Sequence, residues 1–312
     1  MINNLIFFNS AGKGDIHFSR GFCDYAQKIL NPKTCIYYHH WEAQSFKDIC
    51  AFDEKGTKKL KEQPDSRKQE EILRAAYERA GEHNFVINTW VGVPDYRAVL
   101  ARDGITFETH LEIYRRCFSE TFSFNIPTDP NIFLPRINYP CFEIEKIQKV
   151  SNDLKKKNIL IDNCSPKSGQ SHHFDFGPVI NKLATTYPEI NFFVLNTVAD
   201  IKRESNIFFV GEIFDGTTNL NEFSYLSLFC DIIIGRTSGP WMHTIVAENI
   251  QDEKKTFICF CKTEIESSYI NKSYLKANFL WKNTVDLEEI YQTIDSEIKK
   301  QQQPLCNFAF LK

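Results

Sequence analysis

The sequence predicts an α/β protein made of two tandem, doubly wound domains. Its 312 residues exceed one typical α/β domain and match two domains of roughly 150 residues each. In both halves, short apolar runs alternate with amphipathic segments, which is the pattern of parallel strands joined by helical crossovers. A hydrophobic fraction of 42%, with 27 Phe and 12 Tyr, is enough for a sizeable core in each domain.

The first predicted domain spans residues 1–140. Its apolar runs indicate strands at residues 5–9, 35–39 and 85–91, and its amphipathic segments indicate helices at residues 16–30 and 67–80. Four of the twelve prolines then fall between residues 126 and 140, where they interrupt both helix and strand patterns. We therefore place the domain boundary there, followed by a charged linker at residues 141–157.

The second predicted domain spans residues 158–286. Its apolar runs are continuous, as expected for strands that are buried on both faces of a sheet. These strands are expected at residues 158–164, 191–196, 206–211, 231–235 and 256–261. Helices are expected at residues 176–187, 221–229 and 241–248, and a closing helix at residues 287–301 leads into a tail, so that helix and tail together span residues 287–312.

Charge and cysteine content exclude some classes of protein. A formal charge of −3 gives no electrostatic reason to expect a nucleic-acid partner, so we predict none. The ten cysteines are scattered, and several lie in strand-like runs, which favours reduced core thiols over disulfides. The N-terminal apolar run lacks a basic flank and is shorter than the ~20 residues that span a bilayer. We therefore expect a cytoplasmic protein and leave open a peripheral contact with the inner face of a membrane.

The stretch FFNSAGKGDIHFSRGF, residues 7–22, predicts a strand, a glycine-containing turn and a helix. The turn does not match a phosphate-binding P-loop, because Phe7 stands where that motif needs a glycine and Gly14 where it needs Ser or Thr. It does not match a dinucleotide fingerprint either, because His17 occupies the position of the third glycine. A catalytic carboxylate at Asp15 and a tight turn without chemistry are the remaining explanations.

A second strand–turn–helix unit reads DIIIGRTSGPWMHT, residues 231–244. Pro240 suits the first turn of a helix, because proline lacks an N–H that would otherwise stay unbonded. The free N–H groups of that turn, the hydroxyls of Thr237 and Ser238 and the charge of Arg236 together predict an anion site for a diphosphate. An ordinary capped turn is the alternative, because Ser-Gly-Pro is good turn chemistry on its own.

No metal or cofactor is expected. The sequence has no Asp-x-Asp triplet, no CxxC pair and no HExxH pattern. The charge of a diphosphate would then be met by amides, hydroxyls and cations. Lys167 and His172 are candidates for that contact, since they lie in a Ser- and Gly-rich loop at residues 165–177 that follows a predicted strand. A surface loop without a ligand is the alternative.

Two motifs make the chain resemble the GT-B glycosyltransferases, and within them the heptosyltransferase-like branch of lipopolysaccharide and glycan biosynthesis. A G-D-x-x-x-S element is formed by Gly14, Asp15 and Ser19, and a D-T/S-G-x-x-H element is approximated by Thr237, Ser238, Gly239 and His243. The resemblance implies two tandem Rossmann-like domains with an interdomain cleft. The first domain would bind the acceptor and the second the nucleotide-sugar donor.

The resemblance implies that Asp15 is the general base that acts on the acceptor hydroxyl. Gly12, Lys13 and Gly14 would form the acceptor-side loop. The alternative for Asp15 is a cap of the helix that follows, a position in which Asp is favoured. His17 is a second candidate for the base, and a surface histidine without a chemical role is its alternative.

The resemblance also implies contacts to the donor. The nucleotide base is expected at the turn that contains Gly211, Glu212 and Ile213, and the donor ribose near Glu248, although an exposed glutamate is common without any ligand. The predicted donor-binding residues are Lys167, His172, Gly211, Glu212, Ile213, Arg236, Thr237, Ser238, Gly239, Pro240, His243 and Glu248.

The expected activity is an inverting, metal-independent sugar transfer. The donor would be a nucleotide-diphosphate sugar, and the acceptor a hydroxyl of a glycan or lipid-linked saccharide. Two alternatives stay open, since a fold alone does not define a function. One is a nucleotide-sugar epimerase on the same fold, and the other is a non-catalytic sugar-nucleotide-binding module.

Overall fold

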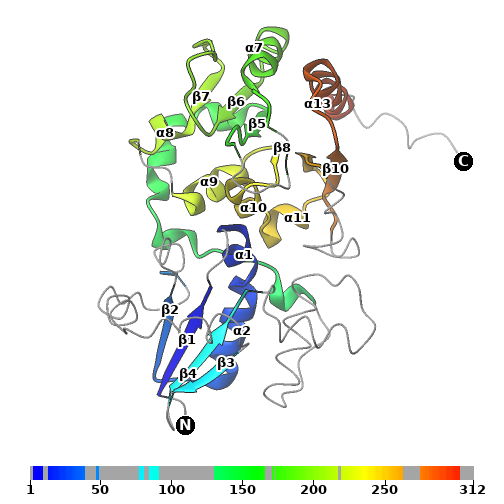
Figure 1. The fold of residues 1–312 in the computed structure, drawn as a ribbon. Helices are drawn as coiled ribbons and strands as arrows, with labels where there is room; N and C mark the ends of the chain where they lie inside the picture. Colours follow the sequence, from blue (N-terminus) through cyan, green and yellow to red (C-terminus); the bar gives the residue numbers. More distant parts are fainter. Residues whose placement is uncertain are drawn as a thin grey trace, which may run out of the picture.

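The computed structural model describes residues 3–9, 13–38, 47–48, 77–80, 84–90, 130–165, 171, 173–216, 219–262 and 275–302. In this part of the chain, helices flank two β-sheets, which lie at opposite ends of the molecule in Figure 1. The smaller sheet is built from the N-terminal strands and the larger one from the C-terminal strands.

The N-terminal sheet has the strand order β2-β1-β4-β3. Its strands are β1 (Asn4–Phe8), β2 (Thr34–Tyr38), β3 (Tyr77–Ala80) and β4 (Asn84–Asn88). β1 runs parallel to β2 and β4, as the crossover pattern predicts, whereas β3 runs antiparallel to β4. Leu5 and Phe7 of β1 are fully buried, since alternate residues of a strand point to the same face.

The predicted helix at residues 67–80 is wrong for its last four residues, which form β3. Tyr77 pairs with Ile87 of β4 and Ala80 with Asn84. Such pairing overrides a local helical pattern, because helix propensity is weak beside tertiary context. Residues 67–76 lie outside the described part of the chain.

Two helices, α1 (Lys13–Phe18) and α2 (Arg20–Leu30), replace the single helix predicted at residues 16–30. Ser19 separates them. Its Oγ donates a hydrogen bond to the carbonyl oxygen of Ile16 at 2.7 Å, and a hydroxyl that bonds the backbone in this way competes with helix continuation. The first of the two helices, α1, starts three residues earlier than the predicted helix.

The C-terminal sheet is entirely parallel and has the order β10-β9-β8-β5-β6-β7. Its strands are β5 (Asn158–Ile161), β6 (Asn191–Val194), β7 (Ile207–Phe209), β8 (Ile232–Arg236), β9 (Thr256–Phe260) and β10 (Asn278–Lys282). The first five lie within or next to predicted strands, and β10 was not predicted. Strand order reverses between β5 and β8, as in a doubly wound sheet.

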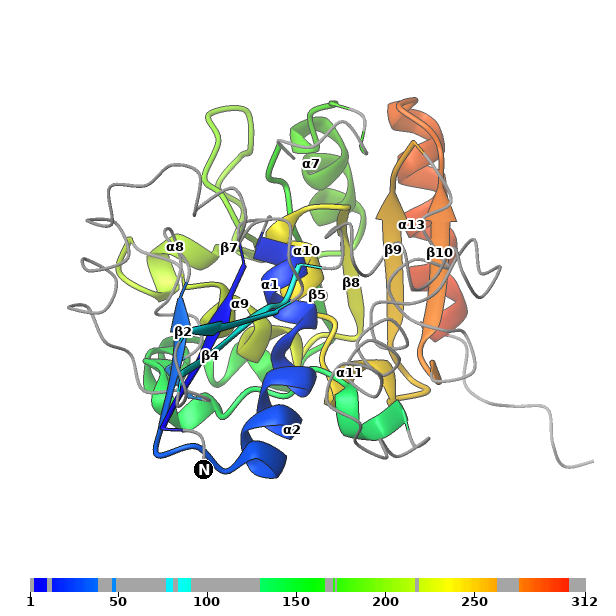
Figure 2. The same ribbon diagram turned by 60° about the horizontal axis from the view of Figure 1, so that its bottom comes forward.

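Helices cover both faces of the C-terminal sheet (Figures 1 and 2). Ile232 and Ile234 of β8 pack with the helices of one face, and Ile233 packs with those of the other. The first face carries α7 (Gly177–Thr186) and α13 (Leu287–Gln302), and the second carries α8 (Val210–Ile213), α9 (Leu220–Ser227), α10 (Gly239–His243) and α11 (Ala247–Ile250). Among the described helices, none is both long and apolar enough to cross a lipid bilayer.

The helix predicted at residues 241–248 is broken into α10 and α11. Thr244 Oγ1 donates a hydrogen bond to the carbonyl of Trp241 at 2.6 Å, and Val246 is extended, with φ −117° and ψ 158°. A back-bonding threonine followed by β-branched residues favours a break in the helix at this point.

Four short 3-10 helices occupy the segment between the two sheets. They are η2 (Pro130–Phe133), η3 (Tyr139–Cys141), η4 (Ile144–Val150) and η5 (Asp153–Lys155). The prolines of this segment agree with the absence of longer helices among residues 130–157. η3 packs on α9, and η4 packs on α8 and α9, so the predicted linker lies against the C-terminal helices. The domain limits at residues 140, 157 and 286 stay predictions.

α1 forms a packing contact between the N-terminal and the C-terminal parts of the fold. It packs against α10, and Figures 1 and 2 both place it beside α10. One continuous hydrophobic cluster contains Phe7 and Ile16 from the N-terminal part together with Met242 and Ile245 from the C-terminal part. The N-terminal helix that carries Asp15 is therefore held directly against the loop and helix that follow β8.

Candidate functional site

The point at which the strand order reverses lies between β5 and β8. Open α/β sheets bind ligands beyond the carboxyl ends of their strands at such a point. Asp162 directly follows β5, and Arg236 ends β8. The residues after these two strands are therefore the first candidates for a site.

Asp162 is a buried carboxylate that links the two strand ends, with 1% of its surface exposed. Its Oδ2 accepts a hydrogen bond from the Ser238 hydroxyl and one from the N–H of Trp241 at 3.1 Å. Its Oδ1 accepts one from the N–H of Cys164 at 2.9 Å. Burial raises the pKa of Asp162, and the hydrogen bond from Ser238 opposes that shift. This carboxylate caps the start of α10, where the sequence analysis expected the diphosphate.

Thr237 and Ser238 use their side chains inside the protein. Ser238 is the N-cap residue of α10, and its Oγ accepts a hydrogen bond from the N–H of Trp241 at 3.2 Å. The Thr237 hydroxyl bonds the hydroxyl of Ser171, which also accepts a hydrogen bond from the N–H of Thr237 at 3.2 Å. These contacts favour an ordinary capped turn over a diphosphate site as the role of the two hydroxyls.

Arg236 is 1% exposed and is bonded to the backbone of the loop after β5. Its guanidinium donates hydrogen bonds to the carbonyl oxygens of Phe174 at 2.8 Å, Asn163 at 3.0 Å and Cys164 at 2.6 Å. It also lies 4.8 Å from the ring centre of Phe174 and 5.1 Å from that of Phe176. Burial lowers the pKa of Arg236. The contacts of Arg236 hold this loop against β8, and they do not support the predicted contact with a phosphate.

A pocket of about 580 Å³ opens beside these residues. It lies at the carboxyl ends of β5, β6 and β7, and the starts of α9 and α10 complete its wall. The pocket contains Gly211, Glu212 and Pro240 of the predicted donor-binding residues, whereas Ile213 is buried in the core. The lining residues are Cys164, Leu195, Asn196, Thr197, Gly211, Glu212, Asp215, Gly216, Leu220 and Pro240.

The pocket wall is acidic. Glu212 and Asp215 line it, and none of the described lining residues carries a positive charge. Arg203 forms an ion pair with Glu212, and Lys149 forms one with Asp215. The hydrogen bond from Lys149 lowers the pKa of Asp215. The wall therefore offers carboxylate hydrogen-bond acceptors, which suit a ligand group that donates hydrogen bonds better than they suit a phosphate.

Several lining residues were not predicted from the sequence, among them Cys164, Asn196, Asp215 and Leu220. The signal that could have found the first two is their position as the last residue of a predicted buried strand, because the carboxyl ends of parallel strands meet at one edge of the sheet. Asn196 Nδ2 lies 2.9 Å from Cys164 Sγ, so these strand ends are in contact.

His17 lies inside the contact between α1 and α10, fully buried. Its Nε2 lies 2.9 Å from the carbonyl oxygen of Ile245, so this nitrogen carries the proton and donates. Its ring lies 4.5 Å from that of His243, whose Nδ1 is 2.9 Å from the carbonyl oxygen of Gly239. Burial, followed by His243 and Arg20, lowers the pKa of His17. The interpretation of His17 as a surface histidine is wrong, and its burial does not support contact with an acceptor.

Asp15 lies in the first turn of α1 and is partly buried. Because α1 begins at Lys13, Asp15 is inside the helix, and the interpretation as an N-cap residue is wrong. An acidic side chain in a first helical turn still interacts favourably with the helix dipole. A Cβ atom on Gly14 would lie 3.2 Å from Met242 Cγ, so glycine at this position permits the close approach of α1 to α10.

The remaining predicted residues do not line the pocket or lie outside the described residues. Glu248 is in the first turn of α11, where it is exposed and 3.6 Å from Arg136. Gly12, Lys167, His172 and the side chain of Lys13 lie outside the described part of the chain. Within that part, no group of three His, Cys, Asp or Glu residues is placed to hold a metal ion.

The described part of the chain is therefore an α/β protein with an open, doubly wound sheet and a pocket at the carboxyl ends of β5, β6 and β7. Three solved structures share this fold along almost the whole chain. The glycosyl transferase family 9 protein from Veillonella parvula is 13% identical and superposes with a TM-score of 0.53, covering 94% of this chain and 89% of its own. No protein-family model and no curated protein matches the chain.

The other two structures are heptosyltransferases from Escherichia coli. WaaC, solved with ADP, is 10% identical with a TM-score of 0.52, and the match covers 96% of this chain and 99% of WaaC. ADP-heptose lipopolysaccharide heptosyltransferase II is 11% identical with a TM-score of 0.55, covering 96% and 100% of the two chains. The predicted resemblance to heptosyltransferase-like glycosyltransferases is therefore confirmed for the fold.

Proposed function

We propose that the protein is a glycosyltransferase that moves a sugar from a nucleotide-diphosphate donor to a hydroxyl of a glycan or lipid-linked saccharide. The observation that carries the proposal is a pocket at the carboxyl ends of the C-terminal strands, on a fold that three glycosyltransferase structures share. One of those structures, WaaC, was solved with ADP. A cytoplasmic location belongs to the same proposal.

The pocket is proposed to hold the nucleoside of the donor. Its volume of about 580 Å³ falls within the ordinary range of small-molecule sites. Glu212 and Asp215 would accept hydrogen bonds from ribose hydroxyls or from an amino group of the base. Lys167 and His172, which lie outside the described residues, would supply the positive charge that the described pocket wall lacks.

Asp15 is proposed as the general base. The helix α1 that carries it packs on α10, and α10 contributes Pro240 to the pocket wall. Asp15 would take the proton of the acceptor hydroxyl while that oxygen attacks the anomeric carbon of the donor sugar. The nucleoside diphosphate would leave from the opposite face, which inverts the configuration. The proposed reaction needs no metal ion.

The first test is a binding screen. A thermal-shift series with ADP, CDP, GDP and UDP should show stabilisation by at least one of them, with about 2.7 kcal/mol expected at a concentration 100 times Kd. Release of free nucleoside diphosphate from the matching nucleotide sugar, in the presence of saccharide acceptors, distinguishes a transferase from a binding module. An epimerised donor sugar without transfer would assign the protein to the epimerases.

Substitution of the base tests the mechanism. Asp15→Asn should leave donor binding unchanged and lower the turnover about 100-fold or more, because it removes the proton acceptor. Asp24→Asn, at a half-exposed carboxylate of α2 that pairs with Lys28, is the matched control and should leave turnover unchanged. Equal turnover of Asp15→Asn and wild type would contradict the role of Asp15. Turnover should also survive EDTA, and loss that Mg²⁺ or Mn²⁺ restores would contradict metal independence.

A further inference from the structure

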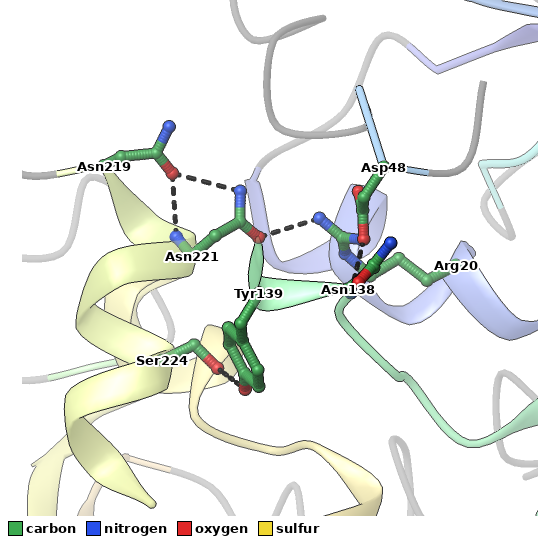
Figure 3. A network of polar contacts seen from close by, with 7 residues as sticks. All are labelled: Arg20, Asp48, Asn138, Tyr139, Asn219, Asn221 and Ser224. Carbon is green, nitrogen blue, oxygen red and sulfur yellow. Dashed lines mark hydrogen bonds and ion pairs between the residues drawn. The ribbon is translucent and has the colours of Figure 1, made fainter. Parts of the chain in front are cut away.

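A buried polar network joins the N-terminal helix α2 to the C-terminal helix α9 (Figure 3). Arg20, the first residue of α2, is fully buried, and its Nη1 donates hydrogen bonds to both carboxylate oxygens of Asp48 at 3.0 and 2.9 Å. Its Nη2 donates a hydrogen bond to Oδ1 of Asn221 at 2.7 Å. A single guanidinium group therefore contacts side chains from both parts of the fold.

The side chain of Asn221 is held in the orientation that accepts this bond. Its Nδ2 donates to Oδ1 of Asn219 at 3.0 Å, and its backbone N–H donates to the same oxygen at 2.8 Å. Asn219 is the N-cap residue of α9. Figure 3 shows the amide oxygen of Asn221 pointing toward Arg20. Because Asn219 holds this amide, its orientation depends on the start of α9.

The contacts of Arg20 with Asp48 and with Asn221 differ in kind. The ion pair with Asp48 is buried, with 0% and 1% of the two side chains exposed. Asp48 also accepts a hydrogen bond from the backbone N–H of Asn138 at 3.0 Å. The bond that reaches α9, by contrast, goes to the neutral amide of Asn221. Movement of α2 away from α9 would break that neutral contact and leave the buried charges of Arg20 and Asp48 paired, so the contact can form and break without stranding a charge.

The network ends next to the pocket. Asn221 directly follows Leu220, which lines the pocket and is the first residue of α9. Asp215 and Gly216, in the turn that precedes α9, line the same pocket. A ligand that contacts this wall would therefore further stabilise the start of α9 and with it the orientation of the Asn221 amide. At the other end of the network, Arg20 follows α1 by two residues.

We propose that Arg20 is a positioning residue that couples occupancy of the pocket to the placement of α1 and α2. A donor nucleotide in the pocket would favour the bond between Arg20 and Asn221, and that bond would hold the helix that carries Asp15 against the donor side. This inference rests on the proposed function. Because coupling between two sites is reciprocal, an acceptor that orders α1 would strengthen donor binding by the same factor.

The test is hydrogen–deuterium exchange with the nucleoside diphosphate that binds in the screen of ADP, CDP, GDP and UDP. Binding to the wild type should slow exchange in α9 and also in α2, by about tenfold in α2, within the 5- to 150-fold range of typical couplings. In Asn221→Leu, which removes the amide oxygen at similar volume, the ligand should still protect α9 but no longer protect α2. Asn221→Asp keeps an acceptor for Arg20 and should retain the protection of α2.

Two further variants keep the test independent of stability. Arg20→Lys retains a positive charge beside Asp48 but lacks the fork that reaches two partners at once, so it should also lose the protection of α2. Ser224→Ala is the matched control on α9, because it removes a buried bond to the Tyr139 hydroxyl at 3.1 Å and leaves Arg20 untouched. It should lower stability while preserving the protection of α2.

The outcomes separate the coupling from the proposed function. If no nucleoside diphosphate binds the wild type, the proposed function fails and the coupling fails with it. If one binds and α2 is protected equally in the wild type, Asn221→Leu and Arg20→Lys, the coupling is overturned and the proposed function stands. Loss of the protection in Ser224→Ala to the same extent would likewise overturn it, because the effect would then reflect stability alone.

Discussion

Gly235→Ala should destabilise the protein strongly, because the space beside Gly235 is filled by Trp241. A Cβ atom at position 235 would lie 2.5 Å from Trp241 Cδ1, 3.0 Å from Trp241 Cγ and 3.2 Å from the Cβ of Asp162. Favourable contacts between carbon atoms need about 3.5–4.0 Å, so the indole would have to move by about 1 Å. Trp241 is fully buried and packs against Phe257 and Trp281, which oppose its displacement.

The expected loss of unfolding free energy is about 3 kcal/mol, at the upper end of the usual cost of overpacking a core. Urea denaturation measures it, and with a slope of about 3 kcal/mol per molar the midpoint should fall by about 1 M. Gly216→Ala is the matched control. Gly216 has a φ of +91° but no atom within 4 Å of an added Cβ, so its cost is backbone strain of about 1–2 kcal/mol without a clash.

A double-mutant cycle tests whether a clash with Trp241 causes the loss of stability. Trp241→Leu alone costs stability through the cavity it leaves, but it also makes room for the added methyl group. Gly235→Ala combined with Trp241→Leu should therefore cost at least about 1 kcal/mol less than the sum of the single changes. Strict additivity would refute the clash with the indole, as would equal stability of Gly235→Ala and wild type.

Two further predictions concern Arg236 and His17, for which the structure indicates other roles than the sequence predicted. Arg236→Met should lower the unfolding free energy by about 3 kcal/mol, because three partly buried carbonyl oxygens lose their donor, and calorimetry should show equal weakening of nucleoside and nucleoside diphosphate binding. If the variant bound the nucleoside diphosphate more weakly and the nucleoside as before, the result would support the predicted contact between Arg236 and a phosphate. Because the pKa of His17 is lowered in the folded protein, the unfolded chain binds more protons below its ordinary value of 6.5. Stability should therefore fall below pH 6.5 by up to about 1.4 kcal/mol per pH unit, until the lowered pKa is reached. His17→Gln keeps a donor for Ile245 and should flatten this dependence in urea titrations, and an unchanged slope would exclude His17 as its source.

The strands of the C-terminal sheet could be predicted because most are buried on both faces. Ile159, Leu160 and Ile161 of β5 are all fully buried, and such continuous apolar runs stand out in a sequence. β10 (Asn278–Lys282) was missed: it is an edge strand whose residues are exposed or half-buried, and its apolar run, Phe279 to Trp281, is short. β3 was missed because its pairing with β4 decided its conformation.

The site was partly predictable. The resemblance placed Gly211 and Glu212 near the donor, the predicted helix start placed Pro240 there, and the structure brings the three residues into one pocket. Whether the side chains after β8 are free to bind a ligand could not be predicted from the sequence. A turn with Arg236 and Ser238 has the composition of an anion site, yet both side chains already have partners inside the protein.

By itself, the sequence determined the α/β class, the places where most strands of the C-terminal sheet end and the chemistry present at those ends. Only the tertiary structure decided which groups meet there. Asp162 and Ser238 are 76 residues apart in the chain, and they bond because the strand order puts β5 beside β8. That pairing fills the start of α10 with the protein's own carboxylate and leaves the pocket on the side of β6 and β7. The physical reason is that a hydrogen-bonding group is satisfied by whichever partner the fold brings within about 3 Å, and local sequence does not specify a partner that lies in a distant strand.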